Sequence, residues 1–134
     1  MLSYLSELFL SQLPEEAKQT QCLIPVPLHR KKQAKRGYHQ THMLAKSLGK
    51  KLNIPVSLRY CQKIIETASQ SQLNRQERQQ NLKDAFQFLK PPFQKITLID
   101  DIITTGSTIQ TMAQGFQKLG VEQIDVWCLA KSIK

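Results

Sequence analysis

The last third of the chain has the pattern of a strand, a tight turn, a helix and a second strand. Residues 95–99 (KITLI) are short and apolar, as a buried parallel strand requires. Residues 108–119 then place apolar side chains at helical spacing, and Gly120 follows as a stop signal. Residues 121–130 (VEQIDVWCLA) form a second strand-like run. Such a unit is a right-handed parallel crossover, so we expect an α/β fold with a central, mostly parallel sheet flanked by helices.

Further strands and helices are predicted upstream of this unit. Residues 22–28 (CLIPVPL) favour a short buried strand, and residues 40–52 place apolar side chains at helical intervals. Residues 54–65 (IPVSLRYCQKII) are rich in branched and aromatic residues and indicate a strand. The glutamine-rich run 66–86 is expected to be a surface loop or exposed helix that joins the core near Ala85.

The length and the N-terminus predict one compact unit in the cytoplasm. At 134 residues the chain fits a single α/β domain, residues 22–134, preceded by a helical segment, residues 1–21. Residues 1–13 alternate apolar and polar side chains and carry Glu7 with no early positive charge, which indicates an amphipathic helix rather than a signal peptide. No apolar run approaches the roughly 20 residues that cross a bilayer, so no membrane span is expected.

The cysteines and the single tryptophan are interpreted as packing residues. Cys22, Cys61 and Cys128 are odd in number and far apart, which fits neither a disulfide framework nor the spacing of a zinc site. We therefore expect reduced, packed thiols. Trp127 lies in the last predicted strand and is expected in the core.

Positive charge is concentrated in one half of the chain. The formal net charge is +9, and no acid occurs between Ala17 and Ile65. That run holds 11 of the 19 Lys and Arg residues: Lys18, Arg30, Lys31, Lys32, Lys35, Arg36, Lys46, Lys50, Lys51, Arg59 and Lys63. Such a surface attracts phosphorylated metabolites or a nucleic-acid backbone, and charge alone does not distinguish these from a merely solvated basic face.

Residues 96–108 (ITLIDDIITTGST) place two adjacent acids and a small-residue turn after the buried strand. Neighbouring carboxylates repel and lose hydration, so Asp100 and Asp101 are interpreted as ligand-binding rather than stabilising. The turn that opens the next helix consists of Thr104, Thr105, Gly106, Ser107 and Thr108. Its glycine allows close backbone approach and the helix start favours an anion, while the acids can accept hydrogen bonds from ribose hydroxyls. The combination predicts a sugar-phosphate site.

Simpler explanations exist for each half of this motif. A carboxylate at a strand end can cap a loop, and TTGST can be an ordinary turn with an N-cap. The occurrence of the acid pair and the TTGST turn together, in register, favours a ligand site. A strand followed by two acids also occurs in P-loop NTPases, but the sequence has neither a GxxxxGK[ST] loop nor a GxGxxG fingerprint. P-loop NTPases and dinucleotide-binding dehydrogenases are therefore both excluded.

The thirteen residues 96–108 resemble the signature of type I phosphoribosyltransferases that binds phosphoribosyl pyrophosphate (PRPP). Upstream, IPVPLHRKKQAKRGYHQ resembles the segment that marks the ComF/GntX branch of this superfamily, and residues 67–86 match a second pattern of that branch. The resemblance covers roughly residues 24–130. It implies the type I phosphoribosyltransferase fold, PRPP as ligand, and an association with DNA uptake and natural competence.

Site roles follow from the resemblance position by position. Asp100 and Asp101 would hold the ribose hydroxyls, directly or through Mg²⁺, as the catalytic pair, and residues 104–108 would bind the 5-phosphate. The pyrophosphate loop would comprise His29, Arg30, Lys31, Lys32 and Arg36. The flexible loop that closes over the site would contribute Gln70, Arg78 and Asn81. The implied chemistry is displacement of pyrophosphate from the anomeric carbon, with Mg²⁺ held mainly through the substrate.

The chain also departs from the family pattern. Tyr38 and His39 stand where the branch usually has Phe and Asn, and no four-cysteine zinc module precedes the domain, which leaves residues 1–21 as the remnant of a hood or linker. Besides a PRPP-binding phosphoribosyltransferase, two hypotheses stay open. One is a non-catalytic accessory protein that binds single-stranded DNA or a competence protein through its basic surface. The other is a fragment or inactive relative.

Overall fold

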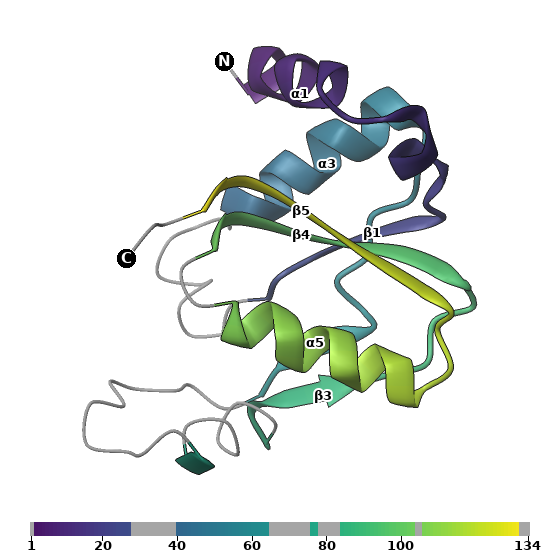
Figure 1. Cartoon of the computed structure of the whole chain (residues 1–134), viewed down its shortest axis with the longest axis vertical. Helices are drawn as coiled ribbons and strands as arrows, with labels where there is room; N and C mark the ends of the chain where they lie inside the picture. Colours follow the sequence, from purple (N-terminus) through teal and green to yellow (C-terminus); the bar gives the residue numbers. More distant parts are fainter. Residues whose placement is uncertain (1, 28–39, 65–75, 78–83, 104–105, 132–134) are drawn as a thin grey trace.

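Three parallel strands form the central sheet of the computed structural model, which describes residues 2–27, 40–64, 76–77, 84–103 and 106–131. The strands are β1 (Cys22–Pro25), β4 (Lys95–Ile103) and β5 (Gln123–Lys131), in the order β1-β4-β5. Both neighbouring pairs are parallel, with Ile24 opposite Leu98 and Leu98 opposite Val126. The predicted α/β fold with a parallel central sheet is confirmed (Figure 1).

Helices cover both faces of this sheet. Helix α3 (Gln40–Leu52) has the bounds that the sequence predicted, and α5 (Ser107–Lys118) connects β4 to β5. In Figure 1 the two helices lie on opposite sides of the strands. Gly120 follows α5 with φ of +93°, a backbone conformation that residues with a Cβ rarely adopt, so its role as a helix stop is confirmed.

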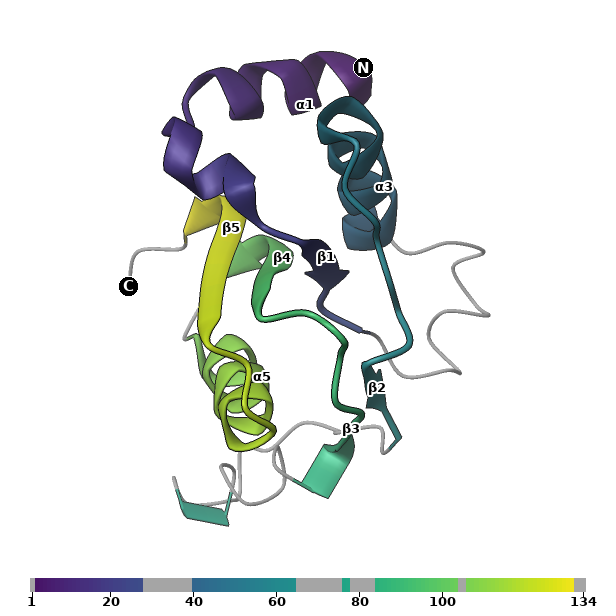
Figure 2. The same cartoon turned by 90° about the vertical axis from the view of Figure 1, so that its right-hand side faces the viewer.

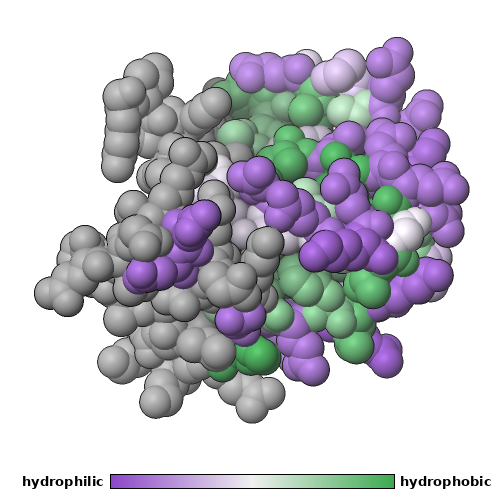
Figure 3. Space-filling view, turned by 60° about the horizontal axis from the view of Figure 1, so that its bottom comes forward, coloured by the Kyte–Doolittle hydropathy of each residue, from purple (hydrophilic) through white to green (hydrophobic). Residues whose placement is uncertain are grey.

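The face of the sheet below α5 is closed by alternate strand residues. Ile109, Met112 and Phe116 of α5 are buried and belong to one apolar cluster with Ile96 and Leu98 of β4. Side chains two apart on a strand share a face, which explains why residues 96 and 98 belong to this cluster while 97 and 99 do not. On the outer side of α5, hydrophilic side chains cover much of the described surface, with apolar patches between them (Figure 3).

The opposite face packs against α3 and the N-terminal helix α1 (Leu2–Ser11). Leu44 and Leu48 of α3 form a second buried cluster with Ile99 and Trp127. Trp127 is only 4% exposed, and the centroid of its ring lies 6.0 Å from that of Phe9 in α1. Its predicted core position is confirmed. After α1, the 3-10 helix η1 (Glu15–Gln19) leads into β1.

Two polar contacts join α1 to α3. The Ser6 hydroxyl donates a hydrogen bond of 2.8 Å to the Ser47 hydroxyl. The Lys51 ammonium lies 3.2 Å from the Glu7 carboxylate. Figure 2 shows α1 across one end of α3, so the N-terminal helix and α3 cover the same face together. None of the described helices has the length and apolar character needed to span a bilayer.

The predicted strand at residues 54–65 is mostly wrong. Within the described residues 54–64, β2 (Cys61–Lys63) is the one strand. It pairs antiparallel with β3 (Phe86–Phe88), which the sequence did not predict. Pro55 has no amide hydrogen to donate, and Val56 makes a single parallel bridge with Leu23. Residues 54–57 therefore run beside β1 without extending the sheet as a full strand.

The cysteines are free, as predicted. Cys22 and Cys61 are buried and Cys128 is half-buried. Burial raises the pKa of the Cys22 thiol to about 11 and that of Cys61 to about 12, because a thiolate loses its hydration in an apolar cluster. Both thiols are packing groups at neutral pH.

Candidate functional site

Strand ends and helix starts meet at one edge of the sheet. Because β1, β4 and β5 are parallel, their carboxyl ends share an edge. Figure 1 shows that α3 and α5 both begin at this edge. In α/β folds, ligands bind at such an edge because helix amides point into it.

Asp100 lies inside β4 rather than beyond it. The sequence predicted a strand that ends at residue 99, but β4 continues to Ile103 because β5 pairs with it as far as Lys131. Asp100 is opposite Cys128 in that pairing and is half-buried, and Asp101 is the next residue of the strand. The two acids thus occupy consecutive strand positions near its carboxyl end.

Gly106 begins α5 in a left-handed conformation. Its φ is 79° and its ψ is 2°, a region that glycine adopts without a Cβ penalty. No side chain caps the helix start, and the first turn contains no acid. The Gly106 carbonyl accepts the first bond of the helix, from the Gln110 amide at 2.9 Å. The helix therefore opens in a tight turn of small residues.

The first turn of α5 has the donors that an anion needs. Ser107 and Thr108 follow Gly106 and are half-buried. The first amides of any helix lack carbonyl partners within the helix, and the helix dipole makes this end positive. One turn later, the Thr111 hydroxyl donates to the Ser107 carbonyl at 2.9 Å, which holds that turn in place. A phosphate group matches this set of amides and hydroxyls.

Most of the other predicted site residues lie outside the described residues. These are Thr104 and Thr105 of the turn, the pyrophosphate-loop residues His29, Arg30, Lys31, Lys32 and Arg36, and the flexible-loop residues Gln70, Arg78 and Asn81. The described part brings β4, with Asp100, and the start of α5 to the same edge. Among the described residues, no three His, Cys, Asp or Glu side chains group together as a metal site would require.

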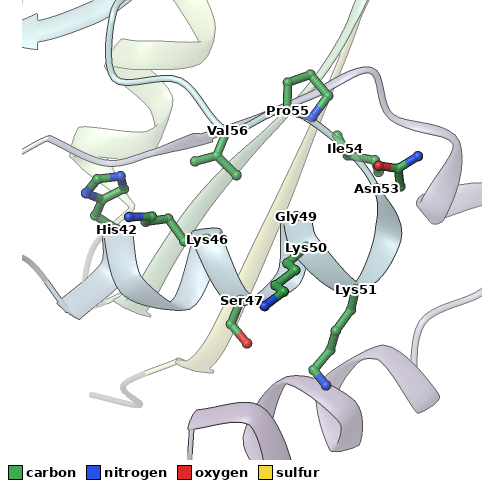
Figure 4. Close-up of a pocket in the computed structure, with 10 residues that line it drawn as sticks. All are labelled: His42, Lys46, Ser47, Gly49, Lys50, Lys51, Asn53, Ile54, Pro55 and Val56. Carbon is green, nitrogen blue, oxygen red and sulfur yellow. The ribbon is translucent and has the colours of Figure 1, made fainter.

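A second feature was not predicted as a site. An open groove of about 1170 Å³ runs along α3. It is lined by His42, Lys46, Ser47, Gly49, Lys50, Lys51, Asn53, Ile54, Pro55 and Val56 (Figure 4). The lysines were recognised as part of the acid-free run, but His42 and residues 53–56 were not connected with them. The spacing of His42, Lys46 and Lys50, four residues apart, was the available signal.

The groove is electrically one-sided. None of the described residues that line it is an acid. Burial, followed by the positive charge of Lys46, lowers the pKa of His42. Figure 4 shows His42 and Lys46 close together beside Val56, while Lys51 reaches toward α1. The lowered pKa leaves His42 neutral at pH 7, so the positive charge of the groove comes from its lysines.

The chain is similar in sequence to competence and DNA utilization proteins. It is 38% identical over 121 residues to competence protein F of Haemophilus influenzae, a match that covers 87% of this chain and 53% of that protein. It is 32% identical over 124 residues to the DNA utilization protein YhgH of Escherichia coli K12, covering 91% of this chain and 52% of the relative. The chain thus spans about half the length of the curated relatives it matches. No protein-family model matches it.

Solved phosphoribosyltransferases share the fold. The purine phosphoribosyltransferase of Pyrococcus horikoshii superposes with a TM-score of 0.56 at 16% identity, covering 97% of this chain and 72% of that one. The orotate phosphoribosyltransferase of Aeropyrum pernix gives 0.55 at 15% identity, covering 96% and 70%. At these identities the likeness is one of architecture alone.

Proposed function

This chain is a relative of competence protein F with the fold of the phosphoribosyltransferases, and from that premise we propose that it binds PRPP at the edge where β4 ends and α5 begins. The observation that carries the proposal is the left-handed Gly106 at the start of α5, followed by Ser107 and Thr108. The 5-phosphate would accept hydrogen bonds from these amides and hydroxyls.

The ribose would lie toward β4. Asp100 and Asp101 come near the carboxyl end of that strand, and carboxylates are acceptors for the donors of two vicinal hydroxyls. Thr104 and Thr105 complete the sequence motif between the acids and Gly106. Asp100 and Gly106 are close in the sequence, which supports one compact ligand that contacts both the acid pair and the start of α5.

Magnesium fits the same edge. Mg²⁺ takes oxygen ligands and is usually held by one or two carboxylates together with substrate phosphates. Asp100 and Asp101 are carboxylates in consecutive positions of β4 and are the residues that would hold it. When bound, the ion would neutralise charge on the pyrophosphate group.

The cellular role that we propose is participation in DNA uptake, in the cytoplasm. It is supported by the names of two relatives, competence protein F and DNA utilization protein YhgH. We further propose that the chain transfers the phosphoribosyl group to an acceptor. Release of pyrophosphate from PRPP in the presence of individual nucleobases would measure this activity.

Isothermal calorimetry with PRPP and Mg²⁺ tests the binding step. The unmodified chain should bind, and Asp100→Asn/Asp101→Asn should bind at least about tenfold more weakly, because a lost hydrogen bond to a charged group costs about 1.5–3 kcal/mol. Asp125→Asn/Glu122→Gln is the matched control. It removes equal charge at the opposite edge, where β5 begins.

The outcomes separate a specific site from general attraction of anions. The control variant should keep the affinity of the unmodified chain, since its substitutions lie away from the ligand. No heat of binding with the unmodified chain, or an equal loss in both variants, would contradict the proposal.

A further inference from the structure

The groove along α3 has two chemically different walls. One wall is the outer side of α3, where Lys46 and Lys50 lie one helical turn apart. Both side chains are exposed, and neither pairs with a carboxylate among the described residues. The other wall is formed by Ile54, Pro55 and Val56, which are apolar. A ligand that fits must therefore be anionic on one side and apolar on the other.

The apolar wall is held in place by backbone bonds. The Ile54 amide donates to the Gly49 carbonyl at 2.9 Å, which ties the wall to α3. The Leu23 amide donates to the Pro55 carbonyl at 2.9 Å, and the Ser57 amide donates to the Leu23 carbonyl at 3.1 Å. These bonds anchor the wall to β1 as well. The groove is thus formed before any ligand arrives, which lowers the entropic cost of binding.

Gly49 sets the width of the groove. A Cβ at this position would lie 2.6 Å from Val56 Cγ2 and 2.7 Å from the Ile54 carbonyl oxygen. Only a residue without a side chain lets residues 54–56 approach α3 this closely. Close approach places the apolar wall directly beside the lysines rather than in a separate surface region.

Polar side chains repeat along the helix, and two of them, Lys46 and Lys50, are positively charged at pH 7. His42, Lys46 and Lys50 are each four residues apart, which corresponds to a rise of about 6 Å per step. A polymer that carries negative charges along its length can contact both of these lysines at once. Lys51 is turned toward α1 and pairs with Glu7, so the row itself consists of Lys46 and Lys50, with His42 at its end.

We propose that this groove binds the phosphodiester backbone of single-stranded nucleic acid, with phosphates on Lys46 and Lys50 and base faces against Ile54, Pro55 and Val56. A single strand has one charged side and freely exposed bases, which is the pattern of the two walls. A duplex keeps its bases stacked inside and carries phosphates on both strands, so it would place charge against the apolar wall. The inference does not depend on PRPP binding.

The groove also has a direction. His42 is in the first turn of α3, at the sheet edge where α5 begins, and the groove continues from there to Asn53 beyond the end of α3. A strand in the groove would run along α3 away from that edge. The proposed sugar-phosphate site and the groove are therefore neighbours that use different residues.

Fluorescence anisotropy with labelled oligo(dT) tests this inference on the full chain. Binding should weaken as salt rises from about 50 to 200 mM, since each phosphate contact contributes about 0.7 to the slope of log affinity against log salt. Lys46→Gln/Lys50→Gln should weaken binding and reduce that slope by roughly 1.4, for two lost contacts. Circular dichroism of each variant checks that the fold is retained.

Lys90→Gln/Lys118→Gln is the matched control. Both lysines are exposed and lie outside α3, after β3 and in the last turn of α5. The control removes the same charge and should keep the slope of the unmodified chain. An equal reduction in both variants would mean that net charge, not the groove, attracts the oligonucleotide, and would overturn the inference.

Three other results would overturn it as well. The first is no binding of oligo(dT) by the unmodified chain at low salt. The second is equal or tighter binding of a duplex of the same length, which would remove the role of the apolar wall. The third is preferred binding of polyglutamate or of vesicles with anionic lipid, which would assign the groove to an acidic protein segment or a membrane surface.

Discussion

The start of α5 and the outer side of α3 are two anion-attracting regions built in different ways. At α5, the donors are backbone amides and short hydroxyl side chains around Gly106, whose positions are fixed by the helix. At α3, the donors are the long side chains of Lys46 and Lys50 beside a rigid apolar wall. Fixed donors select a ligand by shape, whereas flexible lysines select it by charge. The first region suits one compact sugar phosphate and the second an extended polymer.

Both regions depend on one sheet. A substitution in the core should therefore have the largest effect, because it weakens both regions together. Phe116 is fully buried under α5, and its ring packs edge-on against Phe88 at 5.3 Å. Phe116→Ala should lower the free energy of unfolding by about 3–5 kcal/mol. Binding of PRPP and of oligo(dT) should then decline together as the folded fraction falls.

Urea unfolding followed by circular dichroism measures this loss. Gln117→Ala, at the exposed neighbouring position, is the control and should change stability by less than about 0.5 kcal/mol. If Phe116→Ala abolished one binding activity and left the other intact, the two regions would not share a cooperative core.

Removal of one hydroxyl at the start of α5 should weaken PRPP binding there without affecting the α3 groove. Thr108→Ala removes a donor in the first turn of α5 without changing charge. We expect PRPP affinity to fall roughly 10- to 100-fold, the effect of losing one hydrogen bond to a charged group. Thr111→Ala, one turn later, removes a hydroxyl that bonds only to the Ser107 carbonyl in the described structure. It should leave PRPP affinity within a few-fold, and equal losses would refute a local role for Thr108.

The rigidity of the α3 groove can be tested at Gly49. Alanine favours a helix by about 1 kcal/mol over glycine, but its Cβ would meet Val56 and the Ile54 carbonyl at under 3 Å. Overpacking of this kind costs about 1–3 kcal/mol, which exceeds or offsets the helix gain, so Gly49→Ala should destabilise the chain by up to about 2 kcal/mol. Thermal unfolding measures it. A variant more stable than the unmodified chain would show that the wall can move away.

The smallest expected effect concerns the thiols of the α5 face. Cys22 and Cys61 have pKa values of about 11 and 12 in the folded chain, against an ordinary value of 9.0. A raised pKa contributes stability that is complete below pH 9 and is lost as pH rises from 9 through the folded values. At pH 10 the loss should be about 1 kcal/mol for each thiol.

Urea titrations at pH 8 and pH 10 test this difference. Cys22→Ala/Cys61→Ala should lose less stability between the two pH values than the unmodified chain does. Identical losses would mean that other groups account for the pH dependence. Iodoacetamide gives a second readout, because both thiols should react slowly at pH 8 until the chain unfolds.

The sequence predicted those elements whose signal is local. The bounds of α3 follow from its apolar spacing, and the βαβ unit follows from a strand, a helix and Gly120 in succession. The end of β4 was predicted four residues too early, because the apolar run stops at Ile99 whereas the pairing with β5 continues to Ile103. Strand pairing depends on a distant partner and cannot be read from one segment.

The same reason explains what was missed. β3 has only three residues, Phe86–Phe88, and exists through its pairing with β2. The groove requires residues 54–56 to approach α3, and that approach depends on Gly49 and on bonds to Leu23. In contrast, the aspartates and the TTGST turn lie within nine residues of one another in the sequence, so the PRPP hypothesis could be formed from the sequence.

The central claim is that the start of α5 holds the phosphate of PRPP, and amide NMR tests it most directly. Addition of PRPP with Mg²⁺ to the ¹⁵N-labelled chain should produce saturable shifts of the Gly106, Ser107 and Thr108 amides, with much smaller changes at Gln117 and Lys118 at the other end of the helix. Saturable PRPP binding that leaves those three amides unshifted, or no binding at all, would contradict the account.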